Sequence, residues 1–133
     1  MRHPARLLGL ATITALLITT LPTTLSALPI TSVLAQEASQ IGDRQVEADR
    51  LMGQGAEQYN MNQFQTALQS WEQALAIYQE IEDRGGEGAA FGNLALAYYG
   101  LGQYEKAIGF FEKHLEIARE ISDLQGEASA LNG

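Results

Sequence analysis

The sequence of 133 residues contains no cysteine, one tryptophan and three prolines. The absence of cysteine excludes a disulfide scaffold, a thiol nucleophile, a cysteine-ligated zinc or iron–sulfur site and a lipidated cysteine anchor. Basic residues are also scarce, with eight Lys and Arg against 16 Asp and Glu and a formal charge of −8. Because a nucleic-acid-binding chain needs clustered basic residues to neutralise phosphates, we expect a protein partner and no nucleic acid.

The sequence also lacks an uninterrupted apolar run of about 20 residues, the length needed to cross a bilayer. Residues 7–21 form an uncharged run that follows Arg2 and Arg6 and precedes a Val-Leu-Ala segment ending at Ala35. This order of basic, apolar and small residues is typical of a secretory signal peptide. We therefore expect residues 1–35 to be cleaved near Ala35 on export to the periplasm or the cell exterior. The remaining chain would make no stable membrane insertion, and the alternative is an uncleaved membrane anchor.

The rest of the chain repeats with a period of 40 residues, which indicates a repeat architecture. The motif Ile-x-Asp-x-x-x-Glu occurs three times, starting at Ile41, Ile81 and Ile121. Aligning residues 49–88 with 89–128 pairs identical side chains at eleven positions, which are Tyr59/Tyr99, Gln63/Gln103, Ala67/Ala107, Glu72/Glu112, Leu75/Leu115, Ile77/Ile117, Glu80/Glu120, Ile81/Ile121, Asp83/Asp123, Gly86/Gly126 and Glu87/Glu127.

Each repeat unit has the pattern of two helices. Apolar or small residues in the second half of each unit recur at spacings of three and four, which fits one face of a helix and not the alternation of a strand. We expect helices at 47–59, 63–83, 87–100 and 103–123, and the start of a fifth from about 126.

Residues that favour turns lie between these helices. Asn60 and Asn62 in the first unit correspond to Gly100 and Gly102 in the second, and Asn and Gly are the residues that most readily adopt a positive φ. Gly86 and its counterpart Gly126 are expected just past a helix end, with an acidic residue opening the next helix.

A helical hairpin with this order of residues resembles the tetratricopeptide repeat family, in a longer form of about 40 residues. The residues that carry the resemblance are Phe91, Leu94, Ala95, Tyr98, Gly102, Tyr104, Ala107 and Phe111. The resemblance implies an all-α fold in which tandem antiparallel helical hairpins form a right-handed α-solenoid. It also implies that small residues at Gly55/Ala95 and Ala67/Ala107 let paired helices approach closely.

The expected organisation follows from these assignments. After a signal peptide at 1–35 and a linker at 36–46, the chain contains one repeat at 47–88 and another at 89–128, and residues 129–133 begin a truncated third repeat. The exported 40-residue repeats are also similar to the amino-terminal regions of bacterial CHAT-domain proteins. The alternative to an independent scaffold is therefore a regulatory or targeting fragment of a longer exported peptidase whose catalytic domain is absent here.

The resemblance implies that the concave face of the first helices binds an extended peptide or a partner helix. Asn93 matches the family's asparagine that contacts a peptide backbone, and Tyr59 and Tyr99 are the expected aromatic anchors, with Met52 and Leu96 beside them. An amide side chain can donate and accept hydrogen bonds at once, which suits the unpaired backbone groups of an extended segment. The alternative is that Asn93 is a solvent-facing residue without a partner.

Three other features could suggest chemistry, but each has a structural explanation. His114 lies on the packed stripe of its helix without a second histidine at metal-ligand spacing, so we expect a structural role. Glu112, Glu116 and Glu120 recur every four residues and predict a solvated helix face. The glycine-rich segment at 84–88 has no phosphate-loop lysine and no preceding strand, which favours a helix start. We therefore expect no enzyme activity, cofactor or metal; a small hydrolase is a third reading that no motif supports.

The truncated third repeat leaves the second repeat without a complete successor, although repeat units bury their apolar sides on their neighbours. Phe110, Phe111, Leu115 and Ile117 would face that missing unit. We therefore expect either a longer array or self-association through the uncapped second repeat.

Overall fold

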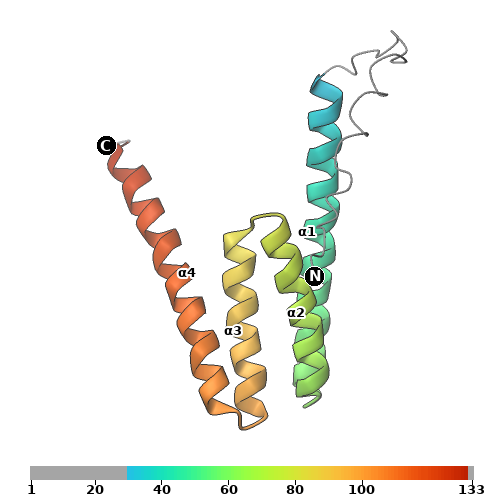
Figure 1. The fold of residues 1–133 in the computed structure, drawn as a ribbon, viewed down its shortest axis with the longest axis vertical. Helices are drawn as coiled ribbons and strands as arrows, with labels where there is room; N and C mark the ends of the chain where they lie inside the picture. Colours follow the sequence, from blue (N-terminus) through green and yellow to red (C-terminus); the bar gives the residue numbers. More distant parts are fainter. Residues whose placement is uncertain (1–29, 132–133) are drawn as a thin grey trace, which may run out of the picture.

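The computed structural model describes the backbone of residues 30–131 and the side chains of residues 30–125. Within this part, the chain forms four helices and no strand: α1 (Ile30–Asn60), α2 (Phe64–Glu80), α3 (Arg84–Gly100) and α4 (Tyr104–Leu131) (Figure 1). Successive helices are antiparallel and pack side by side, so α1 with α2 and α3 with α4 make two stacked hairpins. This is the all-α repeat solenoid that the sequence predicts. Residues 1–29 of the predicted signal peptide and residues 132–133 of the predicted third repeat lie outside the described residues.

The two hairpin turns confirm part of the prediction for asparagine and glycine. Asn62 has a φ of 60° and Gly102 has a φ of 73° in equivalent three-residue turns. Asn60 and Gly100, by contrast, are the last residues of α1 and α3. A Cβ on Gly100 would lie 2.9 Å from the ring of Phe64, so this glycine permits close packing of α3 on α2 rather than a turn.

The joint between the hairpins corrects the predicted role of Gly86. Helix α2 ends at Glu80, and the residue with a positive φ is Glu82, at 59°. Asp83 is the N-cap of α3, and its carboxylate accepts a hydrogen bond of 2.9 Å from the backbone N–H of Gly86, a common way to satisfy a free donor at a helix start. Gly86 therefore lies in the first turn of α3 and not past the end of α2.

Tyr78 explains why position 86 must be small. A Cβ on Gly86 would lie 2.3 Å from the Tyr78 ring, and the Tyr78 hydroxyl donates a hydrogen bond of 2.7 Å to Asp49 on α1. Burial and this hydrogen bond raise the pKa of Tyr78 above its ordinary value, so the phenol stays protonated and keeps donating. One side chain of α2 thus links α1 and α3.

Two helices extend beyond their predicted bounds. Helix α1 begins at Ile30 and includes 36–46, which we assigned to a linker, and all residues from 30 to 43 are exposed. Helix α4 is continuous to Leu131, so the predicted break before a fifth helix at about 126 is wrong. Ser122 lies in the interior of α4 and donates to the carbonyl of Ala118. No proline occurs between Ser122 and Leu131 to end the helix.

The core of the described residues consists of two clusters that meet on α2. The first joins α2 and α3 to one residue of α4, and the second joins α1 and α2 to Ala90 of α3. Ala67, Leu68, Trp71, Phe91, Leu94, Ala97 and Ile117 form the first cluster, and Ala48, Leu51, Ala74, Ile77, Tyr78 and Ala90 form the second. The predicted close approach of the helices is confirmed, because Gly55, Ala67, Ala95 and Ala107 are all buried.

An ion pair recurs in both hairpins and was missed at the sequence level. Arg44 of α1 pairs with Glu80 of α2, and Arg84 of α3 pairs with Glu120 of α4. Arg84 and Glu120 follow Arg44 and Glu80 by 40 residues each. The repetition is therefore present in the sequence, but Arg44 lies outside the aligned range of 49–88. Hydrogen bonding to Glu120 raises the pKa of Arg84. Exposed pairs of this kind contribute little to stability. The ion pair is therefore a recurring feature of the repeat and not an important source of its stability.

Candidate protein-binding face

The curvature of the stack identifies its inner side. Helix α1 contacts α3, whereas α2 and α4 do not contact one another among the described residues. The first helices of the two hairpins are therefore closer together than the second helices. The solvent-exposed side of α1 and α3 is the inner face, where the family resemblance predicts the binding residues.

Three of the predicted residues lie together on the inner face of α3. Asn93, Leu96 and Tyr99 are spaced by three residues, which places them along one side of the helix. Leu96 is 41% exposed and Tyr99 is 60% exposed, while Asn93 is half-buried. The Tyr99 ring lies 5.4 Å from that of Tyr104, which supports the ring from one side and leaves the rest open.

The Asn93 amide has no hydrogen-bond partner among the described residues. Its neighbours Ala89 and Gly92 on α3 are both small. A half-buried amide with free donor and acceptor groups is suited to pair with the backbone of an added segment.

The two predicted residues on α1 have a different environment. Tyr59 packs against Phe64 and Trp71, with ring centroids 5.2 Å and 5.8 Å away. Met52 packs against both core clusters, and its carbonyl accepts a hydrogen bond of 3.1 Å from the Trp71 indole. Both side chains are half-buried. The structure therefore groups Asn93, Leu96 and Tyr99, and places Tyr59 and Met52 mainly in hairpin packing.

His114 is exposed rather than packed as expected, and its ring contacts α3. Its Nδ1 lies 2.7 Å from the carbonyl oxygen of Gly88, which fixes the imidazole between α4 and α3. Gly92 is close to the same ring, since a Cβ there would lie 3.4 Å from Nδ1. A shallow groove of about 170 Å³ beside this contact is lined mainly by small and apolar residues of α3 and α4.

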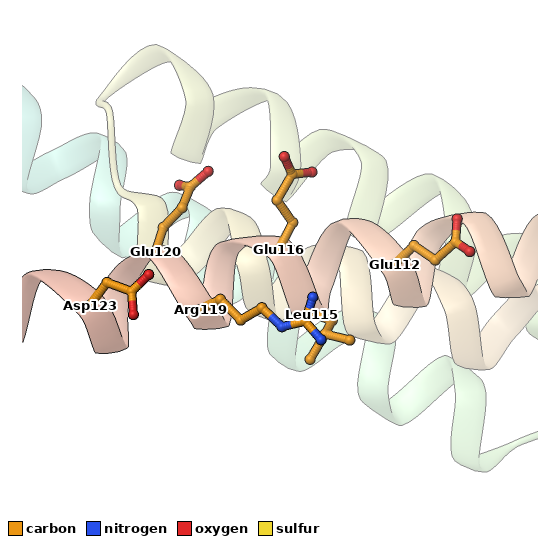
Figure 2. A pocket seen from close by; sticks show the side chains of 6 residues that line it. All are labelled: Glu112, Leu115, Glu116, Arg119, Glu120 and Asp123. Atoms are coloured by element: carbon orange, nitrogen blue, oxygen red, sulfur yellow. The ribbon is translucent and has the colours of Figure 1, made fainter.

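The carboxylates of α4 line the side of the helix and do not converge. Figure 2 shows Glu116 and Glu120 pointing away from the side on which Leu115 and Arg119 lie. Glu120 is already paired with Arg84. No group of three potential metal ligands occurs among the residues that the structure describes.

The polar groups at the start of α3 likewise have partners within the protein. The Asp83 carboxylate occupies the helix N-terminus at Gly86. Glu87, which is 9% exposed, accepts hydrogen bonds from Arg84 and from Gln79, the latter at 3.0 Å. Two acidic side chains at this helix start oppose the binding of a phosphate or another anion there.

None of the helices within residues 30–131 is both long and apolar enough to cross a membrane.

Comparison with known proteins agrees with the observed architecture. A search of curated proteins gives no match. A sequence model of the tetratricopeptide repeat matches residues 47–120. The match extends from the part of α1 that packs on α2 to Glu120, which pairs with Arg84. With more than half of its length matched and two stacked helical hairpins in the matched region, the chain belongs to the tetratricopeptide repeat family.

Proposed function

We propose that the chain is an exported, non-catalytic scaffold that binds an extended protein segment through the inner face of α3. Tetratricopeptide repeats generally mediate protein–protein interactions and are generally non-catalytic. The observation that carries the proposal is the grouping of an unpartnered amide, Asn93, with two exposed apolar side chains, Leu96 and Tyr99.

Each of these residues supplies a different part of the interaction. Asn93 can donate to a backbone carbonyl and accept from a backbone N–H of the bound segment. Tyr99 and Leu96 offer apolar area that a partner side chain can cover, and a tyrosine loses little conformational entropy on binding. The half-buried Tyr59 and Met52 contribute the edge of this surface on α1.

The acidic charge of the chain favours a partner segment with basic residues. The whole sequence has a formal charge of −8, and removal of residues 1–35, which include Arg2 and Arg6, would leave the exported chain more acidic. Electrostatic complementarity of this kind chiefly increases the rate of association.

A photocrosslinking experiment tests binding and export together. A photoreactive side chain replaces Leu96 in one variant, and in the control it replaces Gln69, an exposed residue of α2. We expect a protein adduct in the exported fraction for position 96 and not for position 69, and an N-terminal peptide that begins at Gln36. Equal adducts at both positions would contradict binding at the inner face, and an exported chain that begins at Met1 or Arg2 would contradict cleavage.

A further inference from the structure

Helix α4 carries an exposed apolar stripe. Its large members are Tyr104, Ile108, Phe111 and Leu115, which are 55%, 58%, 40% and 47% exposed. Their spacing of four, three and four residues places them on one face of the helix. The exposed small residues Ala118 and Ser122 continue the same spacing. The set from Tyr104 to Ser122 is called the α4 stripe below.

The first hairpin shows what such a face binds. The counterparts of the large stripe residues, 40 positions earlier, are Phe64, Leu68, Trp71 and Leu75 of α2. That face of α2 is covered by the antiparallel helix α3: Leu68 and Trp71 pack with Leu94 and Ala97, and Phe64 lies against Gly100. The same face of α4 is therefore shaped to receive an antiparallel helix.

The outer side of α1 does not suit this role in a second copy. The α3 residues Ala90, Leu94 and Ala97 are fully buried, and their counterparts in α1 are Arg50, Gln54 and Glu57. Arg50 and Gln54 are hydrogen-bonded to one another at 3.0 Å and both are exposed. Burying these polar groups against an apolar stripe would cost desolvation energy, so head-to-tail stacking of copies is disfavoured.

The α4 stripe is instead complementary to itself when two copies are antiparallel. If Leu115 lies opposite Ala118 of the second copy, Phe111 lies opposite Ser122 and the two stripes overlap from Phe111 to Ser122. Within this overlap each large side chain meets a small one. A repeat of alternating three- and four-residue spacings is the pattern of two-helix coiled coils. The overlap spans 12 residues, or about 17 Å at 1.5 Å per residue.

Charge on one flank of the stripe supports the same register. Glu112 precedes Leu115 by three residues and Arg119 follows it by four, so both flank Leu115 on the same side of α4. Figure 2 shows the Arg119 side chain lying alongside Leu115. Arg119 has no ion-pair partner among the described residues. In the antiparallel register above, each Arg119 lies across from Glu112 of the second copy, which gives two ion pairs.

We propose that the α4 stripe is a self-association surface that pairs antiparallel with α4 of a second copy. The apolar residues provide the affinity, and the Arg119–Glu112 pairs fix the register. The overlap from Phe111 to Ser122 leaves out Tyr104, whose ring lies beside that of Tyr99 on the inner face, so a dimer would present two binding faces. It does not depend on the proposed function.

A charge-swap experiment tests the proposal on the purified chain by sedimentation equilibrium. We expect a monomer–dimer equilibrium, with the dissociation constant raised roughly tenfold or more by Arg119→Glu or by Glu112→Arg, because each places like charges opposite one another. The double variant, with both changes, should return to near the original value. A monomer at all concentrations, or a dimer that neither single change weakens, would overturn the proposal.

An apolar-to-charged substitution provides a second, independent test. Leu115→Asp should abolish the dimer, because it places a carboxylate at the centre of the paired stripes. Leu124→Asp is the matched control, since Leu124 is 65% exposed on the opposite side of the same helix and should leave the dissociation constant unchanged. Circular dichroism spectra should show the same helical content in both variants. Equal effects of the two substitutions would place the association surface elsewhere.

Discussion

Replacing Gly55 by alanine is expected to lower the free energy of unfolding by about 3 kcal/mol, the upper end of the usual cost of overpacking a core. A Cβ at this position would lie 2.3 Å from the Trp71 indole nitrogen. The indole is 2% exposed and is tied to the Met52 carbonyl, so it cannot move aside without losing that hydrogen bond. α1 and α2 would have to separate to accommodate the methyl group.

Gly53→Ala is the matched control on the same helix. A Cβ at Gly53 would have no other atom within 4 Å, so the substitution should raise helix stability by about 0.5–1 kcal/mol. Urea unfolding followed by circular dichroism measures both variants. A Gly55→Ala variant as stable as Gly53→Ala would show that α1 and α2 do not pack as closely as described.

Replacing Trp71 by alanine is expected to cost about 3–5 kcal/mol, the range for removal of a large buried aromatic side chain. Trp71 packs with Leu68, Leu94 and Ala97. Its ring centroid lies 5.8 Å from that of Tyr59. The substitution removes the largest side chain of the first cluster and leaves a cavity between α1, α2 and α3.

The repeat supplies the control for this prediction. Phe111 occupies the equivalent position in the second unit but is 40% exposed, so Phe111→Ala should cost less than about 1 kcal/mol. Both substitutions are measured by urea unfolding in the Leu115→Asp background, so that self-association does not contribute. Similar losses for Trp71→Ala and Phe111→Ala would contradict the difference in burial between the two units.

The 40-residue period and the three- and four-residue spacings within each unit predicted the four helices and their order, and the resemblance to the tetratricopeptide repeat implied their pairing into hairpins. The fold follows from this period because each hairpin must bury its apolar stripe on an adjacent helix. The positions of Asn62 and Gly102 were also predictable, because few residue types adopt a positive φ without strain. Glu82 could not be identified in this way, since nothing about a glutamate indicates that tertiary packing will hold it at a positive φ of 59°.

The continuity of α4 was not predictable from the repeat alone. Asp123 and Gly126 repeat the residues that start α3, so the sequence predicts another break. In the first unit, however, the break is stabilised by contacts such as that of Gly86 with Tyr78, and position 118 has alanine where position 78 has tyrosine. Without such contacts, continuing the helix satisfies the backbone groups at no cost in packing.

The candidate site was only partly predictable for a related reason. Helical spacing correctly grouped Asn93, Leu96 and Tyr99 on one side of α3. The same spacing placed Tyr59 and Met52 with them, but it contains no information on how far a side chain leans toward a neighbouring helix. The Tyr59 ring lies against Phe64 and Trp71, which depends on the distance between α1 and α2.

The affinity of the crosslinked partner for inner-face variants tests the central claim most directly. Binding of the identified partner is measured by titration calorimetry with Asn93→Ala, Tyr99→Ala and the control Gln69→Ala. Loss of a hydrogen bond or of an aromatic contact at an interface typically costs about 1 kcal/mol or more, so we expect the dissociation constant to rise at least about fivefold for the first two variants. The control should bind like the unmodified chain. Unchanged affinity for both Asn93→Ala and Tyr99→Ala would contradict the claim that α3 binds the partner.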